Sequence, residues 1–149
     1  MAKFDMEQTM AVVAVQQLLG DWVYELDFNN GTNIGNFVTD DVVYNVGGSP
    51  REGRAAVQAF YDDFFKQLTA DGGPRPVLRH VNTNFRTSFL SADEVSVTFS
   101  LIFWSTAVPG LNPADVVAVA DVWATCRRGS DGDWKIFRFD STQPLRRVG

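Results

Sequence analysis

The second half of the chain is a succession of β-strand patterns, and this feature most constrains the fold. Apolar and small hydroxyl residues alternate from Val95 to Leu101, which predicts a strand with one buried face. Similar patterns predict strands over 77–89, 94–105, 116–128 and 134–141. Turns rich in glycine and in proline or aspartate separate the last three strands, at 109–113 and 129–133. Successive strands joined by turns predict a β-meander.

The first half has helical periodicity instead. Apolar residues recur in steps of three and four between Val12 and Leu26, which predicts one amphipathic helix over about 5–28. Further segments follow it: a short helix through 34–37, a strand at 41–46, a loop at 47–50 and a second amphipathic helix at about 53–68. Helices followed by strands predict an α+β fold in one domain, 1–149, with the N-terminal helices packed on one face of a curved sheet.

Charge and cysteine content exclude several classes of protein. The net charge is −5 and no block of lysine or arginine occurs, so a nucleic-acid partner is not expected. No apolar run reaches membrane-spanning length, and Asp5 and Glu7 at the N-terminus do not fit a secretory signal. The single cysteine, Cys126, fits a reducing compartment and falls in an apolar strand, where we expect a buried, inert thiol. We therefore expect a cytoplasmic protein.

Two titratable residues stand out for catalysis. His80 is the only histidine, and imidazole exchanges protons near neutral pH. Its alternative interpretation is a solvated residue on a polar strand face. Asp121 interrupts a strand that is apolar on both faces, so we expect it to be buried and hydrogen-bonded, paired or protonated. A single histidine without a Cys-x-x-Cys pattern gives no metal site, and no glycine-rich phosphate loop follows a strand.

Three segments carry a resemblance to a known family. Residues 40–44 and 51–61 resemble the region after the second helix in the SnoaL-like members of the nuclear-transport-factor-2-like superfamily, and 131–136 resembles their final hairpin. The resemblance covers nearly the whole chain. It implies a cone-shaped α+β barrel whose mostly antiparallel sheet holds the helices on its concave face, and a homodimer formed through the sheet.

Individual residues also match family members. Dehydratase and dehydrochlorinase members have an aspartate near the end of the first helix, matched by Asp27, and a histidine early in the strand after the second long helix, matched by His80. The resemblance implies a histidine general base oriented by a carboxylate. Isomerase members imply that Asp121 is a protonated oxyanion donor and that Tyr61 belongs to a hydrogen-bond network.

The chain also departs from these members. Trp22 stands where the dehydrochlorinase members have a lysine, and Phe139 stands where they have an arginine in the last strand. We therefore keep two main hypotheses. The first is a lyase or isomerase without cofactor or metal, acting on an apolar, cyclic small molecule. The second is a non-catalytic ligand-binding or dimerising domain of the same fold, and a third is a non-catalytic small subunit of an oxygenase.

The aromatic residues suggest where a small hydrophobic ligand would bind. The chain has 12 phenylalanines and 4 tryptophans, an aromatic content that suits an apolar pocket or an oligomer interface as well as a core. We predict that Trp22, Tyr24, Tyr61 and Trp104 line the pocket. In the enzyme hypothesis, Asp121 or Tyr24 stabilises the negative charge that develops when His80 removes a proton.

Overall fold

The computed structural model describes residues 3–106 and 115–147. Its helices are α1 (Met6–Asn29), the 3₁₀ helix η1 (Ile34–Phe37) and α2 (Arg54–Gln67). Its strands are β1 (Val38–Val46), β2 (Ser49–Glu52), β3 (Val77–Phe89), β4 (Glu94–Thr106), β5 (Asp115–Arg128) and β6 (Trp134–Arg146). The turn expected at 109–113 lies outside the described residues.

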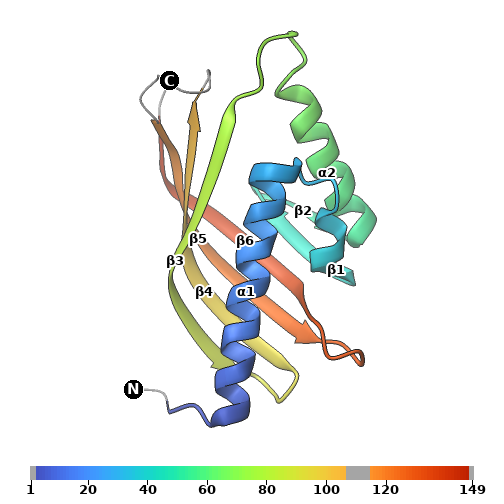
Figure 1. Ribbon diagram of the computed structural model, residues 1–149, viewed down its shortest axis with the longest axis vertical. Coiled ribbons are helices and arrows are strands. Elements are labelled where there is room, and N and C mark those ends of the chain that lie inside the picture. Colours follow the sequence, from blue (N-terminus) through green and yellow to red (C-terminus); the bar gives the residue numbers. More distant parts are fainter. Residues whose placement is uncertain (1–2, 107–114, 148–149) are drawn as a thin grey trace.

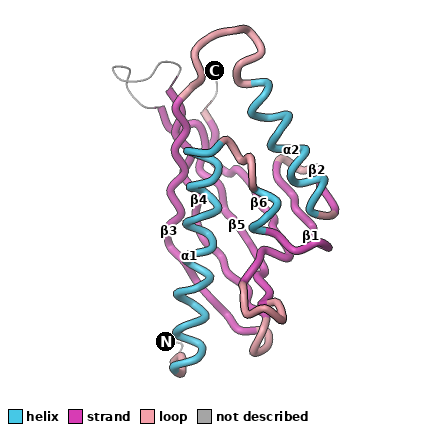
Figure 2. The backbone as a smooth tube through the Cα atoms, turned by 45° about the vertical axis from the view of Figure 1, so that its right-hand side comes forward, coloured by secondary structure: helices cyan, strands magenta, loops and turns pink. Residues whose placement is uncertain are grey.

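The strands form one six-stranded sheet in the order β2-β1-β6-β5-β4-β3. All neighbours are antiparallel except β1 and β6, which are parallel. In Figures 1 and 2, α1 follows the long strands β3 to β6, and α2 lies beyond it, next to β1 and β2. The predicted α+β fold with a curved, mostly antiparallel sheet is confirmed. The sheet has two free edges, β2 and β3, so it is an open cone and does not close into a barrel.

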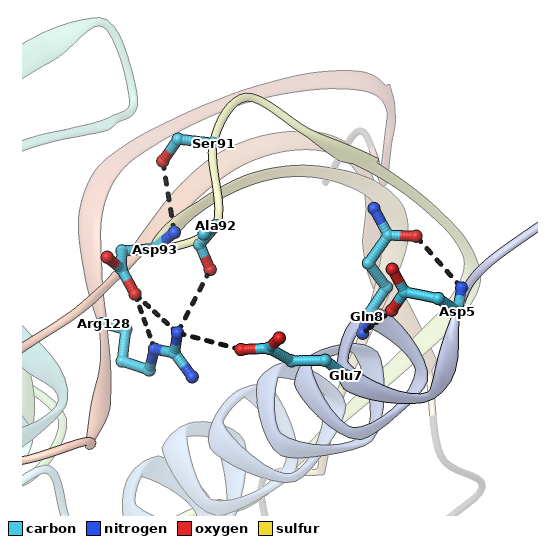
Figure 3. Close-up of polar contacts among 7 residues, drawn as sticks. All are labelled: Asp5, Glu7, Gln8, Ser91, Ala92, Asp93 and Arg128. Carbon is cyan, nitrogen blue, oxygen red and sulfur yellow. Dashed lines mark hydrogen bonds and ion pairs between the residues drawn. The ribbon is translucent and has the colours of Figure 1, made fainter.

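Helix α1 is fixed at its start by local and long-range contacts. The Asp5 side chain accepts a hydrogen bond from the Gln8 backbone N–H, and the Gln8 side-chain oxygen accepts one from the Asp5 backbone N–H, which forms a capping box. The Arg128 guanidinium, at the end of β5, contacts Asp93 at 2.6 Å and Glu7 at 3.6 Å (Figure 3). These contacts tie the first turn of α1 to the β3–β4 turn. Among the described helices, none is long and apolar enough to cross a membrane.

The core lies between α1 and the concave face of the sheet. Val15, Leu19, Trp22 and Leu26, spaced by four, three and four residues, form the buried stripe of α1. Phe139 of β6 packs on Trp22 with ring centroids 5.1 Å apart. Burying each of these large side chains contributes roughly 1.5–3 kcal/mol, so this stripe is a principal anchor of α1 on the sheet.

A bulge in β3 and a tight turn between β1 and β2 help to shape the sheet, and register shifts also occur in the β1–β6, β4–β5 and β5–β6 pairs. In β3 the register with β4 shifts between Thr83 and Arg86, and Asn84 takes a left-handed conformation with φ of 59°. Such a bulge bends a strand and increases its twist. The segment predicted as a loop at 47–50 is instead a tight hairpin, because Gly47 and Gly48 both adopt positive φ and allow β2 to pair with β1.

Candidate active site

Asp27 and His80 meet at the junction of α1 and β3. Asp27 lies in the last turn of α1, where a negative charge is disfavoured by the helix dipole. One of its oxygens, Oδ2, accepts the backbone N–H of His80 at 2.8 Å. The other, Oδ1, lies 2.6 Å from Nδ1 of the same imidazole. Asp27 therefore holds both the main chain and the ring of His80, and its side chain is only 4% exposed.

This contact determines which imidazole nitrogen is available. A carboxylate at Nδ1 favours the tautomer with its proton on Nδ1, so Nε2 carries the lone pair. Among the described residues, none makes a hydrogen bond to Nε2. The ring is also held by Phe103 of β4, which is nearly parallel to it, at 11°, with centroids 4.6 Å apart. A ring fixed on two sides, with one free basic nitrogen, has the geometry of a general base.

His80 lies in the wall of a cavity between the helices and the sheet. The empty space is about 750 Å³, including a part that opens to solvent. Most lining side chains are apolar, and Ala118 and Ala120 of β5 leave room there because their side chains are small. The lining residues are Trp22, Leu26, Val46, Phe60, Tyr61, Phe64, Phe65, His80, Leu101, Phe103, Ala118, Ala120, Val122, Phe139, Ser141 and Gln143.

A buried pair of tyrosines supplies polar groups near the same cavity. The hydroxyls of Tyr44 and Tyr61 are hydrogen-bonded at 2.7 Å. Burial raises the pKa of Tyr61 to about 12 and raises the pKa of Tyr44 well above its usual value, so both remain protonated donors at neutral pH. The indole N–H of Trp22 acts against this rise in the pKa of Tyr44, although it makes no hydrogen bond to a described residue.

The structure therefore brings together four of the predicted residues, His80, Asp27, Trp22 and Tyr61. Sequence reasoning missed Tyr44 and Phe103. The alternation of β1 and of β4 carried a signal for both, because Tyr44 shares a face with the buried Val42, and Phe103 shares one with Leu101.

The other three predicted residues lie elsewhere. Tyr24 is 56% exposed and stacks on Phe28 at the outer side of α1, because it falls off the buried stripe. Trp104 follows Phe103 directly in β4 and so occupies the opposite face of the strand, away from the cavity lining. Asp121 is exposed, not buried as expected, because its neighbours Ala120 and Val122 take the inward positions.

Two further observations concern metal and thiol chemistry. Within 3–106 and 115–147, no group of three or more histidine, cysteine or acidic side chains is placed to hold a metal ion. Cys126 is buried, as expected, and burial raises the pKa of its thiol to about 12. A thiol so protonated is a poor nucleophile at neutral pH.

Comparisons with known proteins agree with this architecture. A family model described as a SnoaL-like domain matches residues 7–140. A search of curated proteins gives no match.

Solved structures with the same fold include proteins that carry the names of enzymes. A type 2 hexachlorocyclohexane dehydrochlorinase is 19% identical with a TM-score of 0.76, over 98% of this chain and 95% of its own. A provisionally assigned scytalone dehydratase from Novosphingobium aromaticivorans is 18% identical with a TM-score of 0.76, over 96% and 92%. A Catenulispora acidiphila protein in complex with S-DNPA is 21% identical with a TM-score of 0.76, over 91% and 95%. At these identities the likeness establishes the fold alone.

Proposed function

The chain belongs to the SnoaL-like family, and from this premise we propose that it is a cofactor-independent lyase or isomerase acting on an apolar, cyclic small molecule. The observation that carries the proposal is the Asp27–His80 pair in the wall of the cavity. A fixed imidazole beside apolar space is suited to removing a proton from a carbon atom, which is the step that such eliminations and isomerisations share.

In the proposed reaction, His80 Nε2 takes a proton from a carbon next to an activating group. The electron pair of the broken C–H bond forms a new double bond. In an elimination, the leaving group departs from the neighbouring carbon, and a hydroxyl leaving group takes the proton back from His80 to form water. In an isomerisation, the proton returns to a different carbon. Asp27 stabilises the imidazolium that exists between the two transfers.

The proposed partner for developing negative charge is the tyrosine pair. Tyr61 lines the cavity, and its hydroxyl is polarised by the hydrogen bond with Tyr44. A protonated hydroxyl can donate to an oxygen that becomes negative during proton removal, and it does so best away from water. We assign Tyr61 the role that the sequence suggested for Asp121 or Tyr24, both of which are exposed.

The test is exchange of solvent deuterium into a panel of bicyclic ketones and hydroxyketones, followed by proton NMR. The wild-type protein is expected to catalyse exchange or elimination with at least one compound. His80→Asn should lower the rate by roughly 10²–10⁴-fold, because general-base catalysis typically contributes that much. Asp27→Asn should also lower it, since the imidazolium loses its counter-charge.

Tyr24→Phe is the matched control, because Tyr24 lies outside the cavity and its loss should leave the rate unchanged. Circular dichroism must show that each variant keeps the wild-type fold. Full activity in His80→Asn would exclude His80 as the base. Binding of a compound from the panel without any turnover would support the second candidate instead.

That second candidate is ligand binding without catalysis. Trp22 and Phe139 occupy positions where the dehydrochlorinase members have a lysine and an arginine, and here the two rings are buried against each other. Among the described residues, the cavity lining accordingly contains neither lysine nor arginine to hold an anionic leaving group. This favours either chemistry with a neutral leaving group or a binding function.

We also propose a homodimer formed through the outer face of the sheet, in the cytoplasm. One apolar residue from each of four strands lies in a row across that face, because the register pairs them in turn: Val81, Ile102, Val119 and Leu145. Val81 is 44% exposed and Leu145 is 64% exposed. An apolar row of this kind on a sheet face is typical of a surface that a partner covers.

The proposed location in the cytoplasm rests on the single cysteine, which is buried and suits a reducing compartment.

A further inference from the structure

Arg51 places a positive charge at the edge of the cavity. It lies in the edge strand β2 and pairs with Tyr44 of β1, so the two side chains share the face that carries the core. Its Cζ atom is 3.6 Å from the centroid of the Phe60 ring, and Phe60 lines the cavity. The guanidinium therefore stands beside the lining without being part of it.

The side chain is held in a fixed position. Nη1 donates hydrogen bonds to the carbonyl oxygens of Val46 at 3.1 Å and Ser49 at 2.7 Å, and the ring of Phe60 supports the guanidinium from one side. The remaining N–H groups on Nε and Nη2 make no hydrogen bond to a described residue. Because a guanidinium is planar and has five donors, such a fixed fork can bind a carboxylate with little further loss of conformational freedom.

Among the described residues, Arg51 has no carboxylate within ion-pair distance, a property that it shares with Arg75, Arg79, Arg86 and Arg146, and only Arg51 of these is stacked on Phe60 of the cavity lining. Arg54, Arg127, Arg128 and Arg138 each lie within 4.0 Å of a carboxylate, at distances from 2.6 to 3.6 Å. Within the described ranges, no carboxylate comes that close to Arg51, although the chain has 18 acidic and only 13 basic side chains. The positive charge of Arg51 acts on the tyrosine pair at the cavity. It favours the ionised forms of Tyr44 and Tyr61 and so opposes the effect of burial on their pKa values.

A half-buried cation without a partner is costly unless something compensates it. We propose that a carboxylate on the ligand is that partner, so that the cavity takes an apolar ring compound carrying an acidic arm. The ring lies against Phe60 and the alanines of β5, and the arm reaches Arg51 at the edge. Arg51 then selects the substrate and fixes its orientation relative to His80. The inference rests on the proposed function only in assuming that the cavity binds a ligand.

The test uses a pair of probes that differ in charge and hardly in shape, naphthoate and naphthamide. Each is titrated as a competitor against the neutral fluorescent compound N-phenylnaphthylamine, which reports occupancy of the cavity. Wild-type protein is expected to bind naphthoate about tenfold more tightly than naphthamide, as a charge-assisted hydrogen bond implies. Arg51→Gln should abolish that preference and leave the affinities for naphthamide and N-phenylnaphthylamine unchanged.

Arg54→Gln is the matched control, because Arg54 lies three residues away in the chain but pairs with Asp40 at the surface. It should keep the preference for naphthoate. Equal affinity of wild-type protein for the two competitors, or an undiminished preference in Arg51→Gln, would overturn the inference. Failure of N-phenylnaphthylamine to bind would overturn both the ligand cavity and the role of Arg51. A naphthoate preference in a protein that turns over no compound would support Arg51 and count against the proposed reaction.

Discussion

The buried hydroxyls of Tyr44 and Tyr61 depend on each other for a hydrogen-bond partner. Tyr44 is fully buried and Tyr61 is 8% exposed, and each hydroxyl satisfies the other at 2.7 Å. Burial disfavours the phenolate, which is why both pKa values are raised. An acid whose pKa is higher in the folded state stabilises the fold below its unfolded pKa, and this contribution disappears as the pH rises through the folded value.

We therefore predict that the protein loses stability between about pH 10 and pH 12, the usual and raised pKa values of Tyr61. A shift of this size corresponds to roughly 3 kcal/mol for Tyr61 alone. Ultraviolet absorbance of phenolate and circular dichroism, followed together against pH, should show two of the three tyrosines ionising as the fold is lost.

Tyr61→Phe should reduce the loss of stability at alkaline pH, whereas Tyr24→Phe should leave that loss unchanged because Tyr24 is exposed. The variant Tyr61→Phe should also be less stable at neutral pH by about 1–3 kcal/mol, because the Tyr44 hydroxyl is left without a partner. Ionisation of all three tyrosines while the protein stays folded would contradict the prediction.

At this scale, part of the site was predictable and part was not. The resemblance located Asp27 and His80, and the pairing of α1 with β3 brings them together. Tyr24 and Trp104 were predicted to line the cavity and do not, because residue type alone does not determine which face of a helix or strand a side chain occupies. Asp121 was expected to be buried but is exposed in the single chain, because its strand is apolar on both faces and only one of these faces packs against the core.

The end of α1 depends on a buried carboxylate. Glu25 is 5% exposed, and its Oε2 accepts from the Asn29 side chain at 2.9 Å while its Oε1 accepts from the Asn33 backbone at 2.7 Å. Its main-chain carbonyl accepts the N–H of Gly31 at 3.0 Å. One residue thus organises the turn between α1 and η1, two positions before Asp27.

Glu25→Ala is expected to lower the free energy of unfolding by about 1–3 kcal/mol, because it leaves a part-buried backbone N–H without an acceptor. Urea denaturation measures the change. Glu7→Ala, which removes an exposed carboxylate from the same helix, is the control and should have a much smaller effect. Equal effects of the two substitutions would show that the turn does not depend on Glu25.

Elements with strong periodicity were predicted almost to their ends. The helix expected at 5–28 is α1, Met6–Asn29, since its apolar stripe and capping residues are local signals. Strand β2 was missed because Ser49–Glu52 has no strand pattern of its own and forms only by pairing with β1. Strand β6 runs past 141 to Arg146 for the same reason, since β5 continues alongside it.

For the whole molecule, we predict a dimer at micromolar concentration by light scattering. Val81→Lys combined with Leu145→Lys should give a monomer, because both side chains are exposed ends of the apolar row and lysines there would repel across a two-fold axis. Leu90→Lys is the matched control, since Leu90 is 60% exposed but lies in the turn after β3. A monomeric wild-type protein would contradict the proposed interface.

The place of β6 in the sheet has a consequence for how the chain folds during synthesis. β6 follows every other strand in the sequence, yet it lies between β1 and β5, and Val38 must pair with Ile136. Such distant pairing is slow, because a long loop must close before the contacts form. During synthesis, the β1–β2 hairpin therefore lacks its neighbouring strand until β6 has been made. Residues of both β1 and β6 line the cavity, so the cavity forms only once the last strand has joined the sheet. A ligand that binds there would stabilise the complete fold and no earlier intermediate.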